Sequence, residues 1–151
     1  KSVELKSGQK GSVLIFMSAR CPCSDSHVPV VKKLSTEFPE FSFAVVHANA
    51  DEPVEEAKTY FKEAAFLFPV INDSEGKLSD QFKALKTPHA FLLDAQGKIL
   101  YKGGVTSSNN AARADKHFLQ DALAEVNSGK TVTVANGRTL GCVIARGKNG
   151  K

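Results

Sequence analysis

One stretch constrains this chain more than any other: an apolar strand that runs into two cysteines at the start of a helix. Val13 to Met17 is a short apolar run that stops at small and charged residues, as a buried strand does. Four apolar residues then recur at the spacing of one helical face: Val28, Val31, Leu34 and Phe38. Cys21 and Cys23 therefore lie at a strand-to-helix junction, with Pro22 between them.

The position of Cys21 predicts a reactive thiol. Proline is favoured at the first helical position, so Pro22 would begin the helix and Cys21 would cap it. A sulfur at that cap faces free backbone N–H groups and the positive end of the helix dipole, and Arg20 adds a full positive charge. Both effects favour the thiolate and lower the pKa of the cysteine. The alternative, a small buried packing residue, fits the polar neighbours Arg20, Ser24 and Asp25 less well.

Length and composition are those of one globular domain. The 151 residues are enough to bury a core without staples, and we expect a single domain over residues 1–151. Hydrophobic residues make up 42% of the chain and charged residues 24%, which excludes a disordered or fibrous protein. The net charge of +4 comes from scattered lysines without interleaved aromatics, so nucleic acid is not expected as a partner. No apolar run approaches the roughly 18 residues that span a bilayer.

The cysteine count and the start of the chain bear on the compartment. Three cysteines are too few for a disulfide scaffold, and a close pair with a distant third, Cys142, suits redox chemistry better. The sequence begins at Lys1 without a methionine, so either a leader was removed or the chain was trimmed. We expect an exported protein, periplasmic or extracellular, in preference to a cytoplasmic one. The sequence predicts no oligomeric state.

The remaining pattern alternates between strands and helices. Extended segments are predicted at 41–48, at 66–71 and, as a hairpin, within 86–103, with shorter segments at 3–5, 131–134 and 140–144. Helices are predicted at 54–64 after Asp51, Glu52 and Pro53, around Leu78, Phe82 and Leu85, and over 111–126, where Gly129 ends the last one. This order indicates an α/β domain with a mixed sheet.

Together these motifs resemble the thioredoxin fold and, within it, the redoxin relatives of the alkyl hydroperoxide reductase/thiol-specific antioxidant (AhpC/TSA) group. The resemblance rests on the strand end at Phe16–Cys21, the Thr87-Pro88 turn with its hairpin at 91–98, and the tail at 139–144, and it covers nearly all of residues 11–146. It implies an α/β, thioredoxin-like fold: a central mixed β-sheet flanked by helices, with a short C-terminal extension. It also implies a thiol–disulfide oxidoreductase that needs no cofactor, with Cys21 as the nucleophile.

The sequence leaves the resolving cysteine open. Thioredoxins carry Cys-x-x-Cys, but Ser24 holds the second position here and Cys23 comes one residue early. A Cys21–Cys23 bond would close a small, strained ring around Pro22. Cys142 is the other candidate, and only the fold can bring it near; its alternative role is a buried core cysteine.

Further contacts with substrate are implied at three residues. By the resemblance, Thr87 pairs with the substrate backbone beside Cys21, and Pro88, which lacks an N–H group, keeps metal ions away from the sulfur. Arg20 completes the predicted substrate-binding set. The expected substrates are protein or small-molecule disulfides and thiols, with a separate electron donor. An ordinary X–Pro turn is the alternative for Thr87-Pro88.

Two other functions would use the same cysteine. With His27, Cys21 and Cys23 could form a soft-metal site, which would make the chain a copper-binding or metal-delivery module; the preferred interpretation assigns no metal. Peroxide reduction would keep Cys21 as the attacking thiol but pass through a sulfenic acid. Among the other histidines, His89 is predicted to be a surface residue and His47 a structural one.

Overall fold

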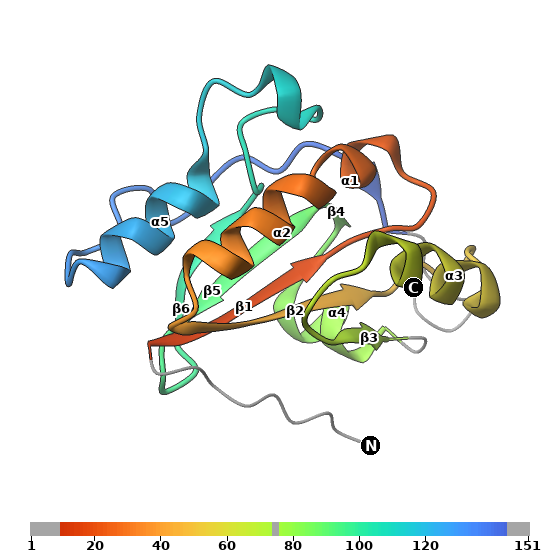
Figure 1. Cartoon of the computed structure of the whole chain (residues 1–151), viewed down its shortest axis with the longest axis horizontal. Coiled ribbons are helices and arrows are strands. Elements are labelled where there is room, and N and C mark those ends of the chain that lie inside the picture. Colours follow the sequence, from red (N-terminus) through yellow and green to blue (C-terminus); the bar gives the residue numbers. More distant parts are fainter. Residues whose placement is uncertain (1–9, 74–75, 145–151) are drawn as a thin grey trace.

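The computed structural model describes residues 10–73 and 76–144 and has a five-stranded sheet at its centre (Figure 1). The strand order is β3 (Val70–Asn72), β2 (Phe41–His47), β1 (Gly11–Phe16), β5 (His89–Leu93) and β6 (Ile99–Gly103). The helices are α1 (Pro22–Ser26), α2 (Val28–Glu37), α3 (Val54–Ala64), α4 (Lys77–Phe82) and α5 (Phe118–Asn127). β2 pairs in parallel with β1 and β3, whereas β5 pairs antiparallel with β1 and β6. This is the mixed sheet that the sequence predicts.

A hydrophobic core lies on each face of the sheet. Alternate residues of β1 point to opposite sides, so this strand contributes side chains to both cores. Val13 and Ile15 belong to the larger core cluster, together with residues of α2, α3 and α5. Leu14 and Phe16 belong to a second cluster, which includes residues of α4 and Ile144 of the tail. β1 is buried along its whole length, which explains why its sequence is a continuous apolar run.

The helix that follows Cys21 is divided in two. α1 begins as predicted, with Cys21 at the N-cap and Pro22 at the first helical position. His27 then separates α1 from α2. The cause is Pro29, which has no N–H group for the carbonyl four residues earlier and whose ring crowds that carbonyl.

The last predicted helix is shorter than expected. Only α5 forms as an α-helix within 111–126, and it is preceded by a 3₁₀ turn, η1 (Ala111–Arg113). The hydroxyl of Ser107 accepts the backbone N–H groups of Asp115 and Lys116, which holds the intervening segment in a turn. Leu85, expected on the face of a helix, lies beyond the end of α4 and is exposed.

Of the short predicted strands, one does not form and another lies outside the described residues. Residues 131–134, which the structure describes, form no strand, because the backbone and hydroxyl of Thr133 donate to the carboxylate of Glu125. The strand expected at 3–5 lies outside the described residues.

The tail after α5 follows the edge of the sheet and then crosses to the cysteines. The Lys102 N–H of β6 donates to the carbonyl of Ala135, and the Gly137 N–H donates to the carbonyl of Lys102. A Cβ on Gly103 would overlap the backbone of Gly137, so glycine is needed for this close approach. Farther on, β7 (Cys142–Val143) pairs antiparallel with β4 (Lys86–Thr87) in a separate two-stranded sheet. Within the described residues, no helix has the length and apolar composition needed to cross a bilayer.

Candidate active site

Cys21 occupies the strand-to-helix junction that the sequence predicts. It caps α1 a few residues after the end of β1, and it is only 4% exposed. Its N–H donates to the hydroxyl oxygen of Ser18 at 3.2 Å, and the Ser18 N–H donates to Ser24 Oγ at 3.0 Å. The cysteine backbone is therefore held by the loop after β1 and by the first turn of α1.

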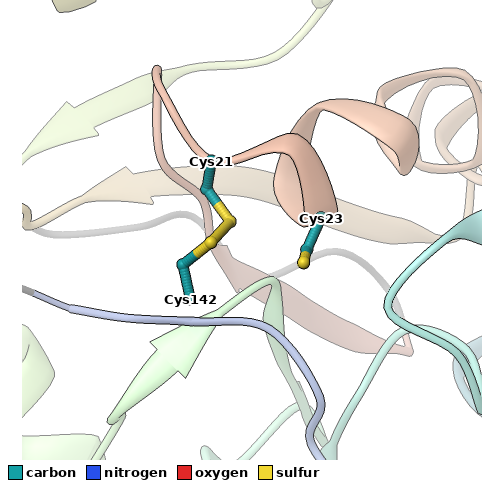
Figure 2. Close-up of side chains that lie close together, drawn as sticks. All are labelled: Cys21, Cys23 and Cys142. Carbon is teal, nitrogen blue, oxygen red and sulfur yellow. A yellow bond between two sulfur atoms is a disulfide. The ribbon is translucent and has the colours of Figure 1, made fainter.

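Cys21 forms a disulfide bond with Cys142, which comes from the far end of the chain (Figure 2). The two residues are 121 positions apart in the sequence, and their Cα atoms lie 6.1 Å apart. Cys23 is a free, partly exposed thiol on α1. All three sulfur atoms lie within 4.8 Å of one another, so the structure brings both candidate partners of Cys21 to one place.

Cys142 reaches Cys21 because the tail pairs with the short strand that precedes Pro88. Thr87 and Cys142 are direct partners in the β4–β7 pair, and the Thr87–Pro88 peptide bond is cis. The carbonyl oxygen of Thr87 lies 3.8 Å from the sulfur of Cys21. The turn that is predicted to contact substrate therefore contacts the tail of the same chain in this structure.

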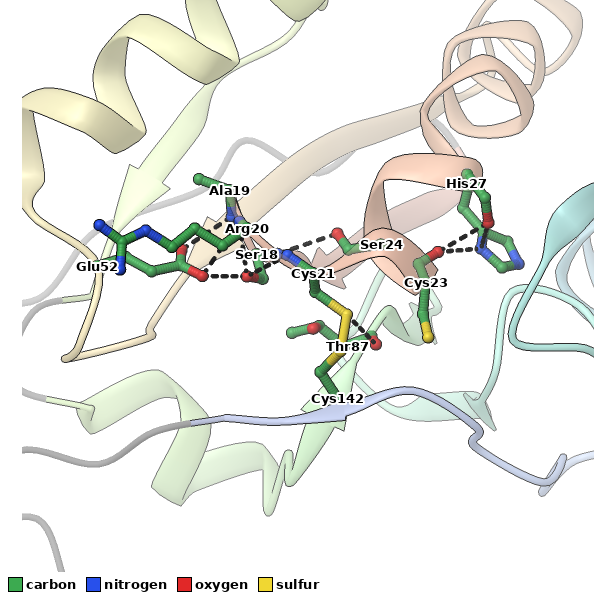
Figure 3. The surroundings of a disulfide bond; sticks show 11 residues. Ser18, Ala19, Arg20, Cys21, Cys23, Ser24, His27, Glu52, Thr87 and Cys142 are labelled. Carbon is green, nitrogen blue, oxygen red and sulfur yellow. Dashed lines mark hydrogen bonds between the residues drawn. A yellow bond between two sulfur atoms is a disulfide. The ribbon is translucent and has the colours of Figure 1, made fainter.

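A buried carboxylate organises the loop after β1 (Figure 3). Glu52 is 6% exposed and accepts hydrogen bonds from the Ser18 hydroxyl and from the backbone N–H groups of Ala19 at 2.8 Å and Arg20 at 3.2 Å. The Nε2 atom of His47 lies 2.7 Å from the same carboxylate. Burial raises the pKa of Glu52, but these hydrogen bonds outweigh burial and hold the pKa below its ordinary value.

Sequence reasoning gave neither Glu52 nor His47 a place at the site. The only local signal is that Glu52 precedes Pro53, which indicates a helix start. Its partners in the loop after β1 lie 32 to 34 residues earlier in the chain, so these contacts depend on the pairing of β1 with β2. An acidic residue in the loop after a core strand that neighbours the cysteine strand is the pattern that could have found it.

Arg20 points away from the disulfide (Figure 3). Its guanidinium forms a two-point ion pair with Glu56, with Nε–Oε2 and Nη2–Oε1 distances of 2.5 and 2.8 Å. The hydrogen bond and charge of Glu56 raise the pKa of Arg20, so the group stays charged. Its charge is thus shared with Glu56, and its contact with substrate stays a prediction.

His27 lies on the side of Cys23 that is away from the disulfide (Figure 3). Its Nδ1 is 2.7 Å from the Cys23 carbonyl oxygen and its Nε2 is 2.8 Å from Thr106 Oγ1, so both ring nitrogens have partners. Burial lowers the pKa of His27, which keeps the ring neutral. Within the described residues, the group of possible metal ligands is Cys21, Cys23 and Cys142, and His27 is not part of it.

His89 is less exposed than predicted for a surface residue. Its ring stacks on Phe91 with a centroid distance of 4.4 Å. Burial, with a smaller contribution from the charge of Lys102, lowers the pKa of His89 to about 4. The ring is therefore neutral near pH 7 and is part of the packing around β5.

Comparison with known proteins places the chain in a family. The sequence profile of the AhpC/TSA family matches residues 1–102, which is more than half of the chain. The chain belongs to the AhpC/TSA family. The predicted family is thereby confirmed on the residues that include Cys21, Cys23, Thr87 and Pro88, whereas Cys142 lies outside the matched range.

Curated relatives of this AhpC/TSA chain are thiol–disulfide oxidoreductases by name. Thiol-disulfide oxidoreductase ResA of Bacillus thuringiensis subsp. konkukian (strain 97-27) is 28% identical over 101 residues, which cover 66% of this chain and 58% of ResA. ResA of Halalkalibacterium halodurans is 27% identical over 109 residues, which cover 70% of this chain and 62% of ResA. The chain spans less than two thirds of the length of these relatives.

Solved structures confirm the thioredoxin-like fold. A hypothetical protein from Sinorhizobium meliloti 1021 aligns with a TM-score of 0.84 over 95% of this chain and 83% of that protein, at 21% identity. A secreted Mycobacterium tuberculosis disulfide oxidoreductase homologous to Escherichia coli DsbE aligns with a TM-score of 0.60 over 82% and 84%, at 18% identity. At these identities the likeness concerns the fold alone.

Proposed function

We propose that this AhpC/TSA chain is a thiol–disulfide oxidoreductase in which Cys21 is the attacking thiol and Cys142 the resolving one. The observation that carries the proposal is the Cys21–Cys142 disulfide, which joins a helix-capping cysteine to a strand of the tail. Membership of the AhpC/TSA family and the name of the ResA relatives support the same activity.

The reaction follows from the two positions. In the reduced chain the Cys21 thiolate attacks a substrate disulfide, forms a mixed disulfide with one substrate sulfur and releases the other as a thiol. Cys142 then attacks Cys21 Sγ, which frees the second substrate thiol and restores the bond between the two cysteines. Two electrons pass to the substrate, and a separate thiol donor must reduce the chain again.

Cys23 takes a third, accessory role in this proposal. Its sulfur lies within 4.8 Å of the other two, so it can exchange with the disulfide once deprotonated. Its place is fixed by α1, two residues from Cys21, whereas Cys142 arrives on a separate strand. We therefore assign the main resolving step to Cys142.

Trapping of the mixed disulfide tests these roles. Reduced chain is mixed with oxidised glutathione, quenched with acid and an alkylating agent, and weighed by mass spectrometry. The unaltered chain should pass quickly to the Cys21–Cys142 form, whereas Cys142→Ser should accumulate one glutathione on Cys21. Cys21→Ser should consume glutathione disulfide no faster than an ordinary cysteine.

Cys23→Ser is the matched control, since it also removes one sulfur from the cluster. It should still form the Cys21–Cys142 bond without accumulating glutathione. Equal consumption by Cys21→Ser and the unaltered chain would overturn the assignment of the nucleophile. Release of glutathione from Cys142→Ser at the rate of the unaltered chain would overturn the assignment of the resolving thiol. Faster oxidation by hydrogen peroxide than by any disulfide would replace the proposal with a peroxidase.

The compartment belongs to the proposal as well. An exported location suits a chain whose cysteines cross-link, because such bonds persist in oxidising compartments. Cell fractionation of the native protein tests it, and recovery in the cytoplasmic fraction alone would contradict it.

A further inference from the structure

The tail of this chain binds the β4 edge as an extended peptide with its own sequence requirements. Thr87 pairs with Cys142 and Lys86 with Val143 across an antiparallel pair. The Ile144 N–H continues the ladder by donating to the carbonyl of Leu85 at 2.8 Å. The bound segment therefore lies along β4 with Cys142 directly at the sulfur of Cys21.

The residue before Cys142 must lack a side chain. A Cβ at Gly141 would overlap the carbonyl oxygen of Thr87, and it would also crowd the Thr87 carbonyl carbon. Both obstacles are backbone atoms of the strand next to Pro88, so they cannot turn aside as a flexible side chain would. Any segment that follows the path of the tail meets the same restriction.

The two residues after Cys142 differ sharply in their surroundings. Val143 is 70% exposed, so this position places no demand on the side chain. Ile144 is 2% exposed and belongs to the second core cluster, with Phe16 and Phe91 among its members. Full burial of an aliphatic side chain is a substantial source of binding energy, so this position anchors the segment.

We infer that the β4 edge accepts, in place of the tail, a partner segment of the pattern Gly-Cys-x-aliphatic, and that such segments are the preferred disulfide substrates. This inference rests on the proposed function, because the cysteine of the segment is the one that Cys21 attacks. The partner is an extended protein or peptide strand: its cysteine takes the place of Cys142, and its aliphatic residue takes the place of Ile144.

The covalent step is a simple exchange. The Cys21 thiolate attacks the sulfur of the segment's cysteine, the old disulfide of the segment breaks, and its other thiol leaves with the electron pair. Because the tail and the segment occupy the same edge, the tail must leave β4 first. Reduction of the Cys21–Cys142 bond removes the covalent link that holds it there.

Activated peptides test the inference. The peptides Leu-Gly-Cys-Val-Ile and Leu-Ala-Cys-Val-Ile are each prepared as a mixed disulfide with thionitrobenzoate. They are reacted with the reduced double variant Cys23→Ser/Cys142→Ser, in which Cys21 is the remaining thiol. Release of the coloured thiolate gives the rate. The glycine peptide should react about tenfold faster, since the alanine peptide must shift away from β4.

Two controls separate the inference from the proposed function. Mixed glutathione–thionitrobenzoate disulfide needs no strand pairing, so its rate should depend on the tail less than the rate of the glycine peptide does. Adding Ile144→Ser to the double variant loosens the tail, so it should raise the rate of the glycine peptide by a larger factor than the rate of the glutathione disulfide. Equal rates for both peptides, or the same rate increase by Ile144→Ser for the glycine peptide and the glutathione disulfide, would overturn the inference alone. Failure of Cys21 to react with any of the three disulfides would overturn the proposed function as well.

Discussion

Loss of the Cys21–Cys142 disulfide should destabilise the native fold by an amount set mainly by the length of the loop that the bond closes. The bonded residues are 121 positions apart. In the chain-entropy treatment, closing a loop of that length removes about 16 cal/mol/K from the unfolded chain, which corresponds to about 4.9 kcal/mol at 25 °C. We therefore expect Cys142→Ser to be less stable than the oxidised chain by roughly 2–5 kcal/mol, as for other long-loop disulfides.

A stability loss near the lower end of that range would mean that the tail leaves β4 once the bond is broken. The full entropic value applies only if the tail keeps its place on β4 after the bond is broken. If the tail is released, the native reduced chain also gains conformational freedom, at the expense of the burial of Ile144. The shortfall from about 4.9 kcal/mol therefore measures the free energy gained by tail release.

The assay is urea unfolding followed by far-UV circular dichroism, because the chain contains no tryptophan for fluorescence. Oxidised chain, reduced chain and Cys142→Ser are compared at one pH. With a slope of roughly 2 kcal/mol per molar urea, the midpoint should fall by about 1–2.5 M when the bond is absent. Oxidised Cys23→Ser is the control, because it loses a sulfur but keeps the loop closed.

Equal midpoints for the oxidised chain and Cys142→Ser would refute the reasoning, because they would mean that the closed loop does not constrain the unfolded chain. A thermodynamic cycle offers an independent check. A native disulfide that stabilises the fold by about 4.9 kcal/mol is harder to reduce than the same bond in the unfolded chain by about 105 mV. The reduction potentials of native and urea-unfolded chain should differ in that direction.

Three further predictions concern residues around the disulfide. Glu52→Gln replaces a buried carboxylate acceptor by an amide, so it should lower the free energy of unfolding by about 1–3 kcal/mol and slow the reaction of Cys21. Unchanged stability and rate would contradict the role of the carboxylate. The depressed pKa of His89, about 4, means that the unfolded chain binds a proton between about pH 6.5 and 4 that the folded chain does not. The free energy of unfolding should therefore decrease as the pH falls through that window. In His89→Gln this decrease should be smaller by roughly 1–2 kcal/mol, after allowance for the partial exposure of the ring. Parallel pH profiles for the two proteins in urea unfolding would contradict this prediction. Cys23 lies within reach of the disulfide, so incubation of the oxidised chain in a thiol buffer at alkaline pH should produce a minor species with a Cys23–Cys142 bond, detected by peptide mapping. Detection of the Cys21–Cys142 bond alone would show that Cys23 does not exchange.

Features that depend on neighbouring residues could be predicted from the sequence. The burial of β1, the capping position of Cys21 and the hairpin of β5 and β6 follow from apolar periodicity, proline placement and a glycine turn. The division of the first helix also had a local signal, since Pro29 removes a hydrogen bond of that helix. The predicted start of the helix at 111–126 was wrong because the Ser107 hydroxyl accepts the backbone N–H groups of Asp115 and Lys116, which competes with the helix.

Contacts between distant segments were out of reach for the same reasoning. Glu52 acquires its role only when β2 lies beside β1 and its carboxylate meets the loop that leads to Cys21. The choice between Cys23 and Cys142 depended on whether the tail returns to β4, and no property of residues 139–144 alone states which strand they pair with. The spacing of Cys21, Cys23 and His27 suggested a metal site, but the ring of His27 faces a backbone carbonyl and Thr106.

A partner cysteine on the tail has a consequence that a partner on the helix would lack. A bond between Cys21 and Cys23 would join two residues of the same helix start and would leave the β4 edge unaffected. The bond to Cys142 instead fixes β7 on β4, so the oxidised chain covers the edge beside the proposed nucleophile, Cys21. In the proposed reaction, the thiol state and the accessibility of the edge change together: reduction frees both Cys21 and the strand position next to it. Re-formation of the bond expels the product strand, because β7 and the substrate compete for the same carbonyl and N–H groups of β4. The tail then supplies both the second thiol and the means of product release.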